Sequence, residues 1–158
     1  MSDFSIAPVL AAADLFDIQE LFRSYAESLP IDLAYQGFED ELAGLPGKYA
    51  PPAGAMLIAR GADDRALGCV ALRPIAGEGV CEMKRLYVEP KARGSGLGGA
   101  LIAAVIESAR TAGYREMRLD TLPTMAAARA MYARAGFREI APYYSTPIEG
   151  TIFLALSL

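Results

Sequence analysis

The chain has 158 residues, 53% of them hydrophobic and 22% charged, with a formal net charge of -4. This length fits one domain over residues 1–158, and the acidic balance argues against a nucleic-acid binder, whose surface is usually basic. No apolar run approaches the ~20 residues that span a membrane, and Met1-Ser2-Asp3 lacks the basic start of a signal peptide, so we expect a cytoplasmic protein.

The first half of the chain predicts a strand, two helices and then three consecutive strands. The strand over residues 4–9 lies at a sheet edge, because Pro8 cannot donate to a central ladder. Apolar residues at helical spacing predict a helix over residues 15–29, with Asp14 as its N-cap and Pro30 ending it. The remaining predicted elements of this half are a short helix over 38–45 and strands over 55–60, 67–73 and 80–88.

Helices and strands alternate in the second half, which predicts an α/β protein. A strand–helix–strand crossover over residues 80–121 should be parallel and right-handed. Gly113 and Gly136 are suited to the C-caps of its helix and of the next one. The predicted elements are a loop over 89–95, a helix over 96–112, a strand over 116–121, a helix over 125–135 and strands over 137–140 and 151–156.

The chain contains no histidine, and this narrows the chemistry available to it. Mechanisms that pair histidine with serine or cysteine are excluded, as are histidine–metal sites, and we expect no metal. A general base must be a carboxylate, a lysine, a tyrosine, a cysteine or water. Cys69 and Cys81 lie in apolar, strand-like runs, so we expect two buried, reduced thiols.

The segment Arg93-Gly94-Ser95-Gly96-Leu97-Gly98-Gly99 lies between a predicted strand and a predicted helix. Glycines let successive backbone N–H groups converge on an anion, and the helix N-terminus adds positive dipole, so a phosphate or pyrophosphate fits. The alternative, which the four glycines and two neighbouring basic residues disfavour, is a tight turn that needs glycine and binds nothing. A Walker loop is excluded because no Gly-Lys pair occurs.

A dinucleotide-binding loop is a distant alternative. Gly94-x-Gly96-x-x-Gly99 matches the spacing of that fingerprint, and Asp120 ends the next strand. However, residues 89–93 separate the loop from its strand, and the chain left after Gly99 is short for the rest of such a domain.

Three motifs resemble those of one family. Arg93-x-x-Gly96-x-Gly98 resembles the [Arg/Gln]-x-x-Gly-x-[Gly/Ala] motif of the GNAT superfamily of acetyl-CoA-dependent N-acetyltransferases. The segment Lys84-Arg-Leu-Tyr-Val88 is similar to the fourth strand of that family, and Ala128-Arg-Ala-Met-Tyr-Ala-Arg-Ala-Gly-Phe137 resembles its Ala-x-x-x-Tyr-x-x-x-Gly-Phe helix end. The resemblance covers about residues 55–140.

The resemblance implies a GNAT-like fold and a binding site for acetyl-CoA as co-substrate. The fold would have a mixed, mostly antiparallel sheet of about seven strands with a parallel, splayed central pair, flanked by about four helices. Backbone groups of Leu86 and Val88 would pair with the pantetheine arm, and the N–H groups of Gly94, Ser95, Gly96, Leu97, Gly98 and Gly99, next to Arg93, would hold the pyrophosphate. Met125 stands where many relatives carry a cofactor-contacting asparagine, which puts that contact in question.

The resemblance also suggests catalytic groups. Glu82 matches the place of a catalytic glutamate in histone-acetylating relatives, and strand alternation would put it on one face with Lys84, Leu86 and Val88. Asp120 and water are the other candidates for the base, and Glu82 is almost equally compatible with a surface ion pair. Tyr132 is expected to protonate the CoA sulfur, and its alternative is simple aromatic packing. A backbone N–H near Val88, at a bulge, would stabilise the oxyanion.

The resemblance implies an acceptor that is a primary amine of a small molecule or peptide, and the sequence leaves its identity open. Arg73, Lys84 and Arg85 would suit a carboxylate-bearing acceptor, whereas the acidic net charge would suit a polyamine or an aminoglycoside. Loops bearing Tyr35, Gln36, Tyr143 and Tyr144 are suited to line the acceptor mouth. A homodimer is a further expectation, because many relatives dimerise. A non-catalytic acyl-CoA sensor is the alternative function, although it would need neither Glu82 nor Tyr132.

Overall fold

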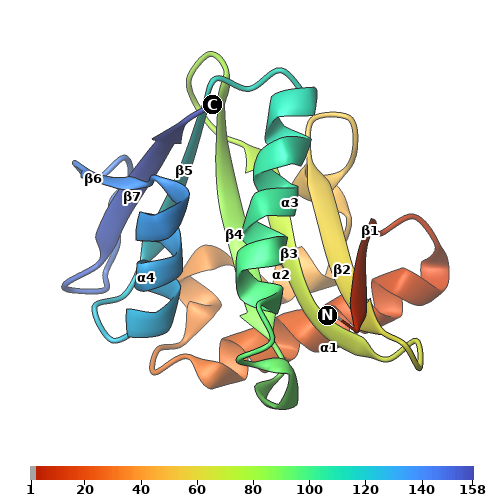
Figure 1. The fold of residues 1–158 in the computed structure, drawn as a ribbon. Coiled ribbons are helices and arrows are strands. Elements are labelled where there is room, and N and C mark those ends of the chain that lie inside the picture. Colours follow the sequence, from red (N-terminus) through yellow and green to blue (C-terminus); the bar gives the residue numbers. More distant parts are fainter. Residues whose placement is uncertain (1–2) are drawn as a thin grey trace.

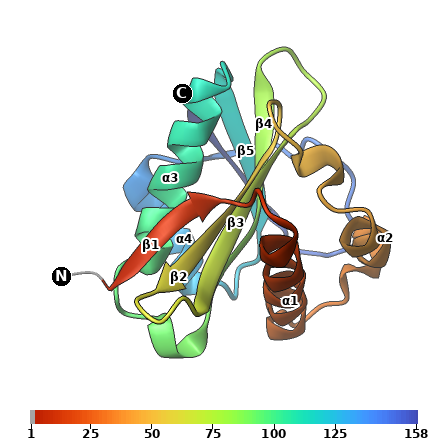
Figure 2. The same ribbon diagram turned by 90° about the vertical axis from the view of Figure 1, so that its right-hand side faces the viewer.

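A seven-stranded sheet forms the centre of the protein, with helices on both faces (Figures 1 and 2). The computed structural model describes residues 3–158. The helices and strands in chain order are β1 (Phe4–Pro8), α1 (Ala12–Ser28), α2 (Phe38–Ala43), β2 (Ala55–Gly61), β3 (Ala66–Pro74), β4 (Val80–Val88), α3 (Leu97–Thr111), β5 (Glu116–Thr121), α4 (Ala126–Ala135), β6 (Arg138–Ile140) and β7 (Ile152–Ser157). Short 3₁₀ helices occur at η1 (Leu33–Gln36), η2 (Gly47–Tyr49) and η3 (Pro90–Ala92).

The sheet has the strand order β1-β2-β3-β4-β5-β7-β6. Only the central pair, β4 and β5, is parallel among the strands described, and the other neighbours are antiparallel. The predicted fold class and the parallel crossover through α3 are therefore confirmed. The mostly antiparallel sheet excludes the dinucleotide-binding alternative, since that fold is built on a mostly parallel sheet.

Two hydrophobic cores lie on the two faces of the sheet. Helices α3 and α4 cover one face, and α1 and α2 cover the other (Figure 2). Strand β2 serves both cores by alternation: Leu57 joins the α3 core, whereas Met56 and Ile58 join the α1 core. Helix α3 packs on the sheet because Leu101 and Val105 recur at helical spacing and are fully buried.

The predicted N-cap of the first helix is wrong. Helix α1 begins at Ala12, so Asp14 lies inside the first turn rather than before it. The Asp14 carboxylate instead accepts a hydrogen bond from Nη2 of Arg60 at 2.7 Å, and Asp17 accepts one from the same nitrogen at 2.8 Å. These contacts join α1 to β2, and a partner so far along the chain leaves no signal in the local pattern.

Strand β4 contains a bulge at Arg85, earlier than the position expected near Val88. The register with β3 shifts by one residue, from Cys69 opposite Tyr87 to Ala71 opposite Lys84. Arg85 adopts φ 62°, a left-handed conformation that is rare outside glycine.

The bulge changes which side chains of β4 share a face. Before it, Cys81 and Met83 belong to the α3 core; after it, Leu86 and Val88 pack against that same core. The expectation that Glu82 and Lys84 share a face with these two later residues is therefore wrong, because one inserted residue reverses the alternation.

Both thiols lie where the sequence predicts. Cys69 and Cys81 are free and buried. Burial raises the pKa of both thiols, that of Cys81 to about 12. Across residues 3–158, no helix combines the length and the apolar content needed to cross a membrane.

Candidate active site

The central parallel pair opens part of the way along its length. Strands β4 and β5 pair only from Val80 to Glu82 and from Glu116 to Arg118. Beyond this ladder the strands separate, as Figure 1 shows below the top of the sheet. The splayed pair implied by the resemblance is present, and it lets groups from the two faces meet.

A cavity of about 760 Å³ lies at the opening. It is bounded by the end of α1, the end of β4, the glycine-rich loop, the start of α3 and one side of α4. The predicted cofactor residues that line it are Leu86, Val88, Arg93, Gly94, Gly96, Leu97, Gly98 and Gly99. Ser95 is the exception, and its Oγ donates to the carbonyl of Ala92 at 2.5 Å, which braces the loop.

The loop geometry suits an anion. Gly94 and Gly96 have φ values of 83° and 87°, which glycine adopts at little cost. Gly96 is the N-cap of α3. The first N–H groups of this helix therefore lie next to the loop, and they have no carbonyl partner within the helix. The positive end of the helix dipole lies at the same place. One donor of Arg93 is used within the protein, because its Nε donates to the Val88 carbonyl at 3.0 Å.

The two glycines at the start of α3 differ in what surrounds them. A Cβ on Gly98 would lie 2.7 Å from Sδ of Met131 on α4, so a side chain here would displace the flexible end of that methionine. A Cβ on Gly99 would meet nothing within 4 Å. Because Gly99 also lines the large cavity, its missing side chain leaves room for a ligand.

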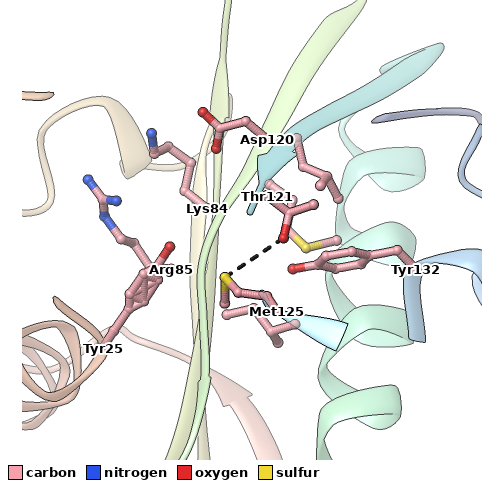
Figure 3. A pocket seen from close by; sticks show the side chains of 10 residues that line it. Tyr25, Lys84, Arg85, Asp120, Thr121, Met125 and Tyr132 are labelled. Carbon is pink, nitrogen blue, oxygen red and sulfur yellow. Dashed lines mark hydrogen bonds between the residues drawn. The ribbon is translucent and has the colours of Figure 1, made fainter. Parts of the chain in front are cut away.

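A small cavity sits at the junction between β4 and β5 (Figure 3). Tyr132 reaches it from α4, and its hydroxyl points toward Thr121 and Met125. Tyr132 is only 6% exposed, and burial raises its pKa, which keeps the phenol protonated. Met125 contacts Thr121, with 3.8 Å between Oγ1 and Sδ, and also lines the large cavity. Asp120 enters the same junction from β5.

A third cavity, of about 370 Å³, lies near Lys84 and Glu82 and is hereafter the acceptor cavity. Its walls come from β3, β4, β5, η1 and the segment between β6 and β7. The residues that line it are Tyr35, Gln36, Arg73, Ile75, Ala76, Glu82, Lys84, Arg118, Tyr143, Tyr144 and Ser145. The four loop residues suggested for the acceptor mouth are all among them.

Glu82 is buried and held in this cavity by polar partners. Nε and Nη2 of Arg73 both lie 2.9 Å from its Oε1, and the Tyr143 hydroxyl donates to its Oε2 at 2.6 Å. Glu82 lies in the last paired position before the opening, so it does not line the junction that holds Tyr132. The two predicted catalytic residues therefore do not share a cavity, whereas Asp120 and Tyr132 do.

Two further charged groups complete the region. Lys84 is buried, and its Nζ donates to Oε1 of Gln36 at 3.1 Å; burial lowers the pKa of this lysine. Asp120 accepts a hydrogen bond from the hydroxyl of Tyr144. Burial raises the pKa of Tyr144, and the hydrogen bond to Asp120 raises it further.

A buried ion pair supports the bulge, and nothing in the local sequence pattern indicates it. Nε and Nη2 of Arg85 each lie 2.9 Å from a carboxylate oxygen of Glu41 on α2. The guanidinium also donates to Gln36 at 3.0 Å and lies over the rings of Tyr25 and Phe38. These contacts fasten the bulged part of β4 to α2 and offset the cost of the left-handed backbone, about 1–3 kcal/mol.

Arg118 is a further charged residue of the site. It follows Glu116 and precedes Asp120 at alternate positions of β5, and this period-two alternation is the sequence signal that groups the three side chains. Its Nε contacts Glu116, and its guanidinium lies over the ring of Tyr143, with 5.5 Å to the centroid.

The fold and the opened central pair agree with the comparisons. The Acetyltransferase (GNAT) family matches residues 15–137. The chain therefore belongs to the GNAT family, and this membership indicates an acyltransferase.

Two relatives that match most of this chain are both described as N-acetyltransferases. An "Uncharacterized N-acetyltransferase" of Schizosaccharomyces pombe is 43% identical over 157 residues, covering 99% of this chain and 96% of that protein. An aminoglycoside N(6')-acetyltransferase type 1 of Klebsiella aerogenes is 40% identical over 142 residues, covering 85% and 92%.

Solved structures share the fold. A GNAT-family acetyltransferase of Staphylococcus aureus superimposes with a TM-score of 0.80 at 19% identity, covering 98% of both chains. The structure of yncA from Salmonella typhimurium, which is described with its cofactor acetyl-CoA, has a TM-score of 0.70 at 20% identity, covering 98% of this chain and 94% of that one.

Proposed function

We propose that this protein transfers an acetyl group from acetyl-CoA to a primary amine, with both substrates bound at once. One observation carries the proposal: a large cavity beside the glycine-rich loop and an acceptor cavity flank the junction at which β4 and β5 separate. Two substrates bound in these cavities would meet at the junction, as direct transfer requires.

The binding part of the proposal uses the large cavity. The N–H groups of the loop and of the first turn of α3 would hold the pyrophosphate, and the pantetheine arm would lie along Leu86 and Val88. The open space at Gly94, Gly96 and Gly99 supports this, because a Cβ there would meet no protein atom within 4 Å. The structure of yncA, which has the same fold and is described with acetyl-CoA, is consistent with acetyl-CoA as the ligand of this cavity.

Transfer needs a group that accepts the proton of the ammonium and one that protonates the leaving thiolate. We propose Tyr132 as the proton donor, because its phenol hydroxyl points into the junction. We propose Asp120, directly or through a water, as the proton acceptor, in preference to Glu82. Both carboxylates accept a hydrogen bond from a tyrosine, but Asp120 lines the junction and Glu82 does not.

The bond changes follow from this arrangement. Asp120 first takes a proton from the ammonium, and the neutral amine then attacks the acetyl carbonyl carbon. The carbon–sulfur bond breaks, the CoA sulfur takes the proton of Tyr132, and the second proton lost by the amine nitrogen returns to the Tyr132 oxygen. The proton on Asp120 passes to solvent. Backbone N–H groups of β4 beside the Arg85 bulge would stabilise the oxyanion, since the ladder with β5 has ended there.

The experiment is release of CoA thiol from acetyl-CoA with a panel of primary amines, for the wild-type protein, Asp120→Asn and Glu82→Gln. We expect amine-dependent release, a loss of about 100-fold or more in kcat for Asp120→Asn, and a smaller loss for Glu82→Gln. A larger loss for Glu82→Gln would return the base to Glu82. Binding of acetyl-CoA without turnover on any amine would instead favour the sensor alternative.

A further inference from the structure

Charged side chains of three neighbouring strands form a row across the acceptor cavity. Arg73 on β3 is the register partner of Glu82 on β4, and Glu82 is the partner of Arg118 on β5. Register partners project from the same face with Cβ atoms about 5 Å apart. All three side chains line the cavity, so an Arg–Glu–Arg row crosses its wall.

The two arginines of this row differ in how far they are satisfied. Arg73 directs Nε and Nη2 at Oε1 of Glu82, both at 2.9 Å, so its charge is matched by that carboxylate. Arg118 uses Nε for Glu116, and among residues 3–158 its hydrogen bonds involve that nitrogen alone. Its terminal nitrogens therefore remain for a ligand, and the guanidinium lies over the ring of Tyr143.

The lining of the acceptor cavity is positive overall. It contains Arg73, Lys84 and Arg118 against the single carboxylate of Glu82. Glu116, which contacts Arg118, does not line the cavity. A polycationic acceptor would meet three like charges, whereas a carboxylate would meet an arginine that can bind it through two parallel hydrogen bonds.

The charge beside the junction has the opposite sign. Asp120 lies two residues after Arg118 on β5, so the two side chains leave the same face about 7 Å apart along the strand. An amine bound for reaction must approach the junction and hence Asp120. A carboxylate a few bonds from that amine would then reach Arg118.

From this arrangement we propose that the acceptor is an amine with a nearby carboxylate, as in amino acids, and that Arg118 binds the carboxylate with support from Arg73 and Lys84. This inference rests on the proposed acetyl transfer and names its substrate class. Arg118 is thus assigned as the residue that selects the acceptor, and it takes no part in the bond changes.

The first test compares acceptors on the wild-type protein. CoA-thiol release is measured with amino acids, with their carboxamides and with polyamines or an aminoglycoside, at equal concentrations of neutral amine. We expect kcat/KM for each amino acid to exceed that of its carboxamide by about 10- to 100-fold, the range for a charge-assisted contact. Equal or higher values for the carboxamides or the polycations would overturn the inference while leaving the acetyl transfer intact.

The second test changes the arginine. Arg118→Gln should lower the acid-to-amide ratio of kcat/KM about tenfold or more through KM, and Arg118→Lys should lower it less. The matched control is Arg23→Gln on α1, an exposed arginine that pairs with Glu20 at 3.7 Å and lines none of the three cavities of the site. An unchanged ratio in Arg118→Gln would refute the assignment. Because the ratio compares two substrates on one protein, a partly unfolded variant does not distort it. No transfer to any amine would overturn the proposed function and this inference together.

Discussion

Replacing Glu41 by glutamine removes the charge that balances Arg85 beneath the β4 bulge. The Arg85 side chain is 1% exposed, and both oxygens of Glu41 lie 2.9 Å from its nitrogens. Breaking a buried pair from one side costs about 3–5 kcal/mol, because the remaining charge stays buried without its partner. We expect about 3 kcal/mol, the low end, since the amide oxygen still accepts one hydrogen bond and Gln36 still accepts another.

The assay is equilibrium unfolding in urea at pH 7, with Glu39→Gln as the control. Glu39 lies on the same helix, is exposed, and carries the same charge. With a slope of about 1–3 kcal/mol per molar urea, Glu41→Gln should lower the unfolding midpoint by about 1–3 M. The control should change the free energy of unfolding by less than about 0.5 kcal/mol. Equal losses in the two variants would refute the view that this pair supports the bulge.

The same pair predicts a pH dependence. Burial would raise the pKa of Glu41, but the hydrogen bonds and charge of Arg85 outweigh it and leave the pKa below its ordinary value of 4.5. A lowered folded-state pKa means that the stabilisation is fully present above that ordinary value and is lost as the pH falls through the folded-state pKa. The stability difference between wild type and Glu41→Gln should therefore be constant at neutral pH and shrink in acid.

The other predictions concern the site and the thiols. Tyr132→Phe should lower kcat by about 10- to 100-fold with little change in acetyl-CoA affinity by calorimetry, and an unchanged kcat would remove the phenol from the acid role. Gly99→Leu should weaken acetyl-CoA binding while the thermal midpoint holds, because its side chain would enter open space. Unchanged affinity in this variant would mean that the loop does not hold the ligand. Cys69 and Cys81 should both resist a thiol reagent in the folded protein and react in denaturant, since burial raises the pKa of each, and rapid labelling at pH 7 would contradict this.

The helices, the strands and the glycine-rich loop could be predicted from the sequence because their signals are local. Helical and alternating periodicity located the helices and strands to within a few residues, since each pattern spans one element. The glycines of residues 94–99 likewise indicated a strand-to-helix loop suited to an anion. The structure agrees, with two left-handed glycines and a helix that starts at Leu97.

The tertiary structure alone decided which side chains meet. Glu82 and Tyr132 are reached from different cavities, whereas Asp120 joins Tyr132 at the junction. One inserted residue at Arg85 reverses the alternation of β4, and the carboxylate that pairs with this arginine lies on α2, 44 positions away in the chain. Strand register and buried ion pairs depend on such distant partners. The periodicity of the sequence therefore predicts the helices and strands and their order. Which strand face each side chain occupies, which cavities form and which charges line them depend on the assembled sheet.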